Sequence, residues 1–136
     1  MYSSIIVAVD VAQIDRAESI LLKASALSSP DGRITLVNVI EEVPGYLTIE
    51  IPDDLMMTAR TDSETRLRAL RDRVGVNAGI EIRNGSPARE ILTAAEANNA
   101  DLIIIASHKP DLSNYFIGAT ADRVVRHAKC SVLVDR

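Results

Sequence analysis

The chain has 136 residues, of which 47% are hydrophobic and 25% are charged, and its formal net charge is −4. This length suits one domain with a real core, and the acidic balance argues against a nucleic-acid surface. The single cysteine, Cys130, excludes an internal disulfide framework, and the apolar runs are too short to span a bilayer. The first residues, MYSSIIVAVDV, lack the basic region of a signal peptide, so we expect a cytoplasmic protein without membrane insertion.

Strands and helices alternate along the first half of the chain. Residues 4–10 (SIIVAVD) are apolar and β-branched, which predicts a strand buried on both faces. A helix is then predicted by apolar residues at helical spacing: Ile14, Ala17, Leu21 and Ala24. Residues 29–32 (SPDG) predict the end of this helix and a turn. Residues 33–40 (RITLVNVI) predict the second strand, and residues 41–54, with two prolines and a glycine, predict a loop.

A long helix and a short strand come next. The helix is predicted by one stripe of residues: Met56, Ala59, Ser63, Leu67, Leu70 and Val74. On the solvent-facing side of this helix we expect i,i+4 ion pairs, Asp62 with Arg66 and Glu64 with Arg68. Residues 80–83 (IEIR) alternate between apolar and charged side chains, which predicts a strand at a sheet edge.

The last third repeats the pattern. Ser86-Pro87 predicts a helix start, because serine can cap free amides and proline fits the first helical position. Residues 101–107 (DLIIIAS) predict the fourth strand, a helix starts near Gly118, and residues 130–135 (CSVLVD) predict the fifth strand. This regular alternation predicts one α/β domain, residues 1–136, with a parallel sheet between two helical layers. A flavodoxin-like sandwich is a common solution for five such strands.

In such sheets a ligand binds outside the carboxyl ends of the strands, where the winding reverses. If the first and fourth strands are neighbours, Val9 and Asp10 meet Ser107 and Gly118, beside the segment 38–39. Asp10 could accept hydrogen bonds from ribose hydroxyls or hold a divalent cation, and the amides that open the last helix favour phosphate. These residue types suit a nucleotide.

Each of these residues also has a purely structural interpretation. Asp10 at a strand end can be a helix cap, and Gly118 can simply start a helix. His108 can be a solvated side chain, and Lys109 with Asp111 can be a surface ion pair. The sequence contains no GxxxxGK[ST] motif, no GxGxxG after the first strand, no GxSxG elbow and no cysteine–histidine cluster with zinc spacing.

Four segments, IIVAVD, NGSPAREI, DLIIIAS and above all GATADRVVRHAKCSVLVDR, resemble the universal stress protein family, and the resemblance covers the whole chain. It implies a flavodoxin-like, adenine nucleotide hydrolase-like fold with strand order 3-2-1-4-5, usually as a dimer. One branch of that family binds ATP through Gly-x-x-Gly, nine residues, then Gly-Ser/Thr. Here Ala106 and Lys109 replace the first two glycines, and eight residues instead of nine separate Lys109 from Gly118. Ala119 stands at the position of the Ser/Thr, and Thr120 follows it.

The segment 106–111 (ASHKPD) is similar to a subgroup in which this form replaces the glycine-rich loop and adenine nucleotides are bound. By position, the resemblance places these residues along the adenosine: Ala8, Val9, Asp10 and Val39. It places these residues around the phosphates: Ala106, Ser107, His108, Lys109, Gly118, Ala119 and Thr120. Magnesium is expected between phosphates, without a direct protein ligand.

Three functions remain open on the sequence. The first is a dimeric stress or regulatory protein that binds adenine nucleotide, as ATP with Mg²⁺ or as AMP or ADP. The second is a slow ATPase or self-phosphorylating enzyme that involves His108 or Ser107, although no base and nucleophile pair can be placed. The third is a nucleotide-free dimeric adaptor whose crevice is vestigial. A regulatory protein partner is also open. We expect the dimer to form through residues 131–135, an apolar strand at a sheet edge.

Overall fold

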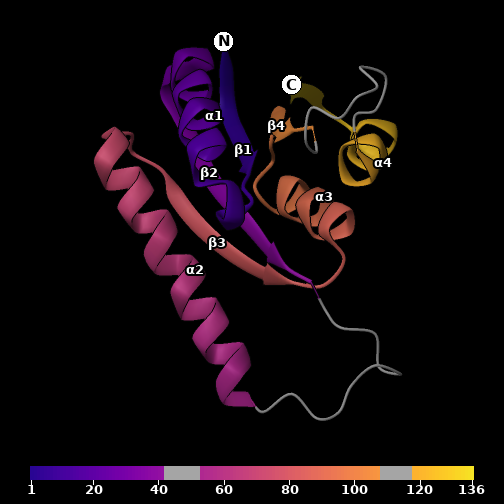
Figure 1. Cartoon of the computed structure of the whole chain (residues 1–136). Coiled ribbons are helices and arrows are strands. Elements are labelled where there is room, and N and C mark those ends of the chain that lie inside the picture. Colours follow the sequence, from indigo (N-terminus) through magenta and orange to yellow (C-terminus); the bar gives the residue numbers. More distant parts are fainter. Residues whose placement is uncertain (42–52, 108–117) are drawn as a thin grey trace.

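The computed structural model describes residues 1–41, 53–107 and 118–136, and over these residues the chain forms a five-stranded parallel sheet in the order β3-β2-β1-β4-β5 (Figure 1). The strands are β1 (Tyr2–Ala8), β2 (Ser28–Ile40), β3 (Gly79–Asn84), β4 (Leu102–Ala106) and β5 (Ser131–Asp135). The helices are α1 (Ile14–Leu27), α2 (Asp53–Val74), α3 (Pro87–Ala97) and α4 (Ala119–His127), and a short 3-10 helix, η1 (Val11–Gln13), precedes α1. The expected α/β fold and strand order are confirmed.

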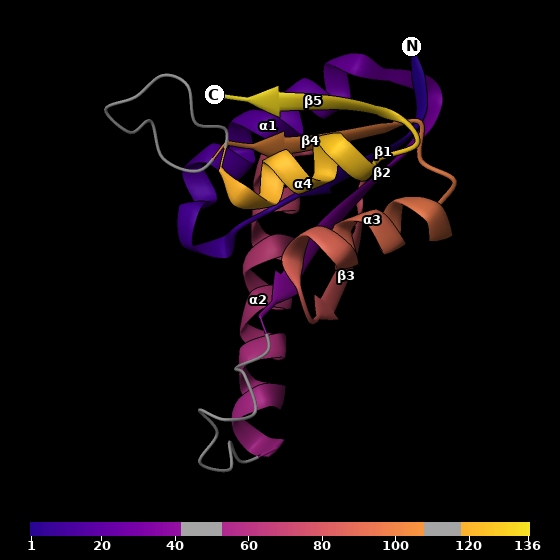
Figure 2. The ribbon, with the colours of Figure 1, turned by 90° about the vertical axis from the view of Figure 1, so that its right-hand side faces the viewer.

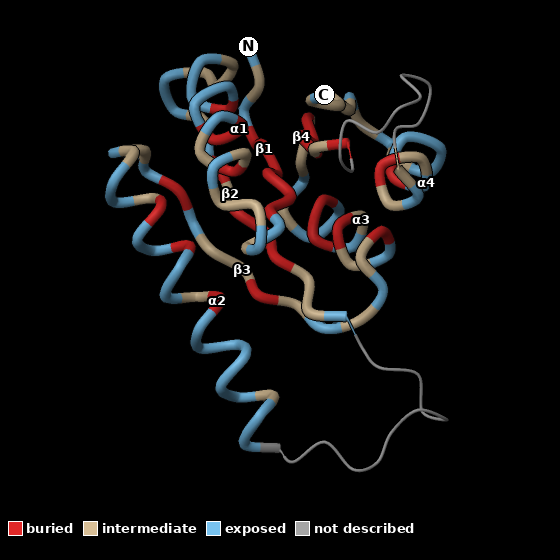
Figure 3. The backbone as a smooth tube through the Cα atoms, in the orientation of Figure 1, coloured by how far each residue is buried: buried red, intermediate tan, exposed pale blue. Residues whose placement is uncertain are grey.

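The sheet lies between two helical layers, α1 with α2 on one face and α3 with α4 on the other (Figures 1 and 2). Side chains of β1 alternate between these faces, because successive residues of a strand point to opposite sides. Ile5 and Val7 join the α1–α2 core, whereas Ile6 and Ala8 join the α3–α4 core. Both sets are buried, which explains the uninterrupted apolar run of this strand (Figure 3). No helix in the described ranges is long and apolar enough to cross a membrane.

The predicted turn at residues 29–32 is wrong, because β2 already begins at Ser28. Tyr2 pairs with Ser28 and Ser4 pairs with Arg33, so residues 29–32 form an irregular insertion within the β1–β2 pairing. A Cβ atom on Gly32 would lie 3.0 Å from the backbone oxygens of Ser29 and Tyr2, and 2.3 Å from Ser28 Oγ, which would have to rotate away, so glycine relieves crowding at this close approach. The turn-forming residues therefore make a bulge, which proline and glycine favour as they favour a turn.

The predicted stripe of α2 is only half buried. Leu67 and Leu70 are almost completely buried, but Met56 is only partly buried and Ala59 is exposed. The 22-residue helix is about 33 Å long, whereas the neighbouring six-residue β3 spans about 20 Å, so its first turns extend past the sheet (Figures 2 and 3). The two predicted ion pairs are present, at 3.2 Å for Asp62–Arg66 and 2.7 Å for Glu64–Arg68.

The start of α3 follows the prediction in one respect only. Pro87 occupies the first turn as expected, but the Ser86 side chain makes no capping hydrogen bond. The backbone carbonyl of Ser86 accepts a hydrogen bond of 2.9 Å from Glu90 N. Ser86 is exposed, so its hydroxyl can form hydrogen bonds with water instead. The predicted side-chain cap at Ser86 is therefore wrong.

Candidate nucleotide-binding pocket

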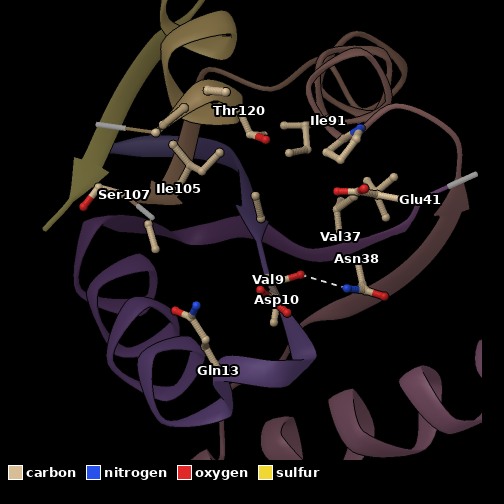
Figure 4. A pocket seen from close by; sticks show the side chains of 17 residues that line it. Val9, Asp10, Gln13, Val37, Asn38, Glu41, Ile91, Ile105, Ser107 and Thr120 are labelled. Atoms are coloured by element: carbon tan, nitrogen blue, oxygen red, sulfur yellow. Dashed lines mark hydrogen bonds between the residues drawn. The ribbon is translucent and has the colours of Figure 1, made fainter. Parts of the chain in front are cut away.

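The carboxyl ends of β1, β2 and β4 meet the amino terminus of α4 around a pocket of about 450 Å³ (Figure 4). Every predicted site residue in the described ranges lines it: Ala8, Val9, Asp10, Val39, Ala106, Ser107, Gly118, Ala119 and Thr120. His108 and Lys109, the other two predicted site residues, lie outside the described residues, as does Asp111. The position agrees with the rule for open α/β sheets, because the winding reverses between β1 and β4.

The β1–β2 side of the pocket is fixed by hydrogen bonds. Val9 N donates to the Val37 carbonyl at 2.9 Å, and the Val9 carbonyl accepts from Asn38 Nδ2 at 2.9 Å. Asn38 is buried, so its side chain serves the framework and keeps the end of β1 in place (Figure 4). The position of Asn38 next to the site is predicted by the sequence, but this use of its side-chain amide is not.

The backbone of Val39 faces the pocket. The peptide groups of successive residues in a parallel strand point alternately to its two neighbouring strands. In β2, the Val37 carbonyl points to β1. The Ile40 carbonyl points to the β3 side, where Gly85 N donates to it at 3.0 Å. The N–H and C=O of Val39 therefore point in the same direction as those of Val37. They lie beyond Ala8, the last residue of β1 in the pairing, and no described residue forms a hydrogen bond with them.

Asp10 joins β1 to η1. Its Oδ1 accepts a hydrogen bond of 2.9 Å from Ala12 N, so the capping interpretation is confirmed. The side chain is exposed and lines the pocket, and its second oxygen has no hydrogen-bond partner among the described residues. One carboxylate thus caps the turn and still offers an acceptor to a ligand.

Ser107 lies at the opposite side of the pocket and is held by an unpredicted arginine. Its N–H donates to the Asp135 carbonyl at 2.8 Å, and its carbonyl accepts from Arg16 Nη1 at 2.6 Å. Arg16 Nη2 donates to the Asp135 carbonyl at 3.2 Å, and Lys23 forms an ion pair with the Asp135 carboxylate. A single arginine in α1 thereby joins the exits of β4 and β5, which no spacing pattern in the sequence indicates.

The first backbone amides of α4 have no partner among the described residues. Gly118 has φ 86° and ψ 152°, a conformation that essentially only glycine adopts, and no side chain caps the helix. The first intrahelical bond that reaches back to Gly118 comes from Asp122 N, at 2.9 Å, so the preceding amides of Ala119 and Thr120 have no helical acceptor. The Thr120 hydroxyl points into the same space (Figure 4). Free amides and the helix dipole together favour an anion here.

The far wall of the pocket contains residues that the sequence did not predict for the site. Pro87 and Ile91 of α3 form an apolar side together with Val37, and Gln13 and Glu41 add polar side chains. The strand ends are recognisable from the sequence, whereas the register of α3 against β2 is set by tertiary packing. The described ranges contain no cluster of three or more histidine, cysteine or acidic residues that could hold a metal ion.

Cys130 is not part of this pocket. It is half-buried and packs near the α3–α4 core. Burial, with a smaller contribution from the charge of Asp101, raises the pKa of its thiol, so the thiol is not activated as a nucleophile.

Comparison with known proteins identifies the fold and the family. A profile of the universal stress protein family matches residues 1–136. Universal stress protein G of Shigella flexneri is 29% identical over 145 aligned positions, which cover 100% of this chain and 100% of that protein.

Solved structures agree with this match. The hypothetical protein MJ0577 superposes with a TM-score of 0.80 at 25% identity, covering 98% of this chain and 95% of that one. A universal stress protein solved in complex with cAMP superposes with a TM-score of 0.61 at 18% identity, covering 99% and 97% of the two chains, and shares the fold. Since the family match spans the whole sequence, this chain belongs to the universal stress protein family.

Proposed function

We propose that the protein binds an adenine nucleotide, as ATP with Mg²⁺ or as AMP or ADP, and acts as a regulatory or stress-response protein. The proposal rests on two sets of backbone groups that lie on opposite sides of one pocket. The uncapped amides of α4 lie on one side, and the outward-facing peptide of Val39 lies on the other. A nucleotide requires a site for its anionic phosphates at one end of the pocket and hydrogen-bonding groups for its base at the other.

The order of the strands supports one orientation of the nucleotide. Val39 at the end of β2 would contact the base through its N–H and C=O. Asp10 at the end of the adjacent β1 would accept from ribose hydroxyls with its free oxygen. Ser107 after β4 and the amides of α4 would contact the phosphates, with the hydroxyl of Thr120. The pocket volume lies within the range of small-molecule sites, roughly 300–1,000 Å³.

The small number of side chains in the pocket that could bind a metal ion also agrees with Mg²⁺ bound between the phosphates. This cation keeps several waters and commonly binds protein through few side chains. Asp10 is the only predicted site residue with a carboxylate, and one of its oxygens is already used by Ala12 N. In this arrangement the chain holds the nucleotide, and the nucleotide holds the cation. The relative in complex with cAMP supports a nucleotide as the class of ligand in this fold.

Thermal unfolding tests the proposal. A ligand that binds only the native state stabilises it by about 2.7 kcal/mol at a hundredfold excess over Kd, so Mg-ATP should raise Tm in a concentration-dependent way. Adenosine, which lacks the phosphates, is the matched ligand control and should give a smaller shift. An unchanged Tm at millimolar Mg-ATP would contradict the proposal and favour a nucleotide-free adaptor. Accumulation of ADP during the incubation would indicate an ATPase.

A further inference from the structure

Glu41 lines the side of the pocket that is formed by the end of β2. It follows β2 directly, two residues after Val39 and four after Val37, and all three line the pocket. Such spacing places side chains on the same face of an extended chain. Figure 4 shows the Glu41 carboxylate directed toward the interior of the pocket, on the side of Val37 and Ile91 and away from Ser107.

Within the described part of the chain, the surroundings of this carboxylate leave its oxygens without a partner. Its neighbours along this wall, Val37, Pro87 and Ile91, carry no side-chain donor. Among the described residues, no cation or hydrogen-bond donor pairs with Glu41. An ionised carboxylate is an acceptor only, so it can bind a ligand only through that ligand's donor groups.

The charge of Glu41 also sets the direction of a bound nucleotide. Phosphates placed at this wall would meet a like charge without a neutralising cation, whereas the amino terminus of α4 attracts them. This contrast favours the base at the β2 side, in agreement with the orientation proposed above. There the peptide of Val39 supplies one donor and one acceptor, which match a ring nitrogen and one N–H of an exocyclic amino group. An amino group has a second N–H, which Val39 cannot also accept in the same plane.

We propose that Glu41 is a specificity-determining residue whose carboxylate accepts this second N–H and so selects amino-substituted nucleobases. The inference rests on the proposed nucleotide binding and goes beyond it. It assigns base selection to a side chain at the β2 exit, in addition to the backbone of Val39. Glu41 is also the first residue of the predicted loop 41–54.

The test compares ATP with purine riboside 5′-triphosphate, which differs from ATP only by lacking the 6-amino group. Isothermal titration calorimetry with Mg²⁺ would measure both Kd values for the wild type, for Glu41→Ala and for Asp31→Ala. Asp31 is an exposed carboxylate in the amino-terminal part of β2, so its removal controls for the loss of one negative charge. We expect the wild type to prefer ATP, and Glu41→Ala to reduce that preference on the order of tenfold, the usual effect of one charge-assisted hydrogen bond.

The outcomes separate the inference from the proposed function. A preference that falls in Glu41→Ala and persists in Asp31→Ala supports the inference. ATP binding with an equal preference in wild type and Glu41→Ala would overturn it and leave the proposed function intact. Absence of binding of either triphosphate at millimolar concentration would overturn both. Circular dichroism of each variant confirms folding, which neither substitution should disturb because both side chains are exposed.

Discussion

At the scale of single residues, the pocket uses groups that also hold the fold together. Asp10 caps η1 with one oxygen, and Asn38 fixes the carbonyl of Val9. A structural interpretation of such a residue therefore does not exclude a functional one. The sequence could predict Asp10, because a carboxylate at a strand end is informative in both interpretations. It could not predict the role of Asn38, because that role depends on which residue lies opposite in the sheet.

Gly118 gives the clearest prediction at this scale. Its φ of 86° and ψ of 152° cost a residue with a side chain about 1–3 kcal/mol. Gly118→Ala should therefore lower the free energy of unfolding by about this amount, or move the start of α4 and weaken Mg-ATP binding. Urea denaturation and calorimetry measure the two effects.

Gly79→Ala is the matched control for Gly118. Gly79 has an ordinary φ, and the nearest atoms to an added Cβ lie at 4.0 Å, so this variant should fold and bind as the wild type does. Equal stability and equal ATP affinity for Gly118→Ala and Gly79→Ala would show that the backbone at Gly118 neither needs glycine nor serves the ligand.

At the scale of secondary-structure elements, the periodicity of the sequence predicted which elements form but not how far they extend. Strands such as residues 101–107 were recognisable because a buried parallel strand is apolar on both faces. The spacing in residues 56–74 identified the apolar face of α2 but carried no information on the length of β3 beside it. Likewise, residues 29–32 contain signals that a turn and a bulge share. These errors arise where tertiary contacts decide between equivalent local patterns.

Arg16 connects three elements, and its loss should loosen the phosphate side of the pocket. Arg16→Met leaves the carbonyls of Ser107 and Asp135 without this donor, which should cost about 1–3 kcal/mol. The amide of Ser107, which donates to Asp135, should exchange faster with solvent in hydrogen-exchange measurements. Arg33→Met is the control, because Arg33 is exposed and forms no hydrogen bond or ion pair with a described residue. Equal exchange at Ser107 in both variants would mean that Arg16 does not support this strand end.

Asp101, directly before β4, forms hydrogen bonds with the start of β1, and these bonds make a prediction for how stability depends on pH. Hydrogen bonds from the backbone N–H groups of Ser3 and Ser4, both at 2.9 Å, lower the pKa of its carboxyl. A lowered pKa in the folded state contributes stability that is present above the unfolded pKa of about 4 and is lost as the pH falls through the folded value.

Asp101→Asn should therefore be less stable than the wild type at pH 7, and the difference should shrink below about pH 4. Urea midpoints measured between pH 7 and pH 2.5 test this. Asp31→Asn, which removes an exposed carboxylate without a partner among the described residues, should show no such dependence. A stability difference that stays constant down to pH 2.5 would contradict the assignment.

At the scale of the whole molecule, the two edges of the sheet differ. The edge at β3 is flanked by α2, whose Arg60 Nη2 donates to the Ile82 carbonyl at 3.0 Å. The other edge is β5, and no described strand pairs with its outer side. The Asp135 carbonyl points inward, where it accepts from Ser107 N, so by alternation the peptide groups of Val132 and Val134 point outward. We propose that these groups pair with β5 of a second copy around a two-fold axis.

Val134→Pro tests this dimer because proline removes one outward N–H and leaves the inward bonds of Leu133 and Asp135 to β4 available. Sedimentation velocity should show a dimer for the wild type and a larger monomer fraction for the variant. Charging Leu133 would be a poorer test, since this side chain packs against the α1–α2 core and its loss would also weaken the fold. Val134→Ala is the control, because it shortens the same side chain and keeps the N–H. If Val134→Pro sediments as the same dimer as Val134→Ala, the copies associate through another surface.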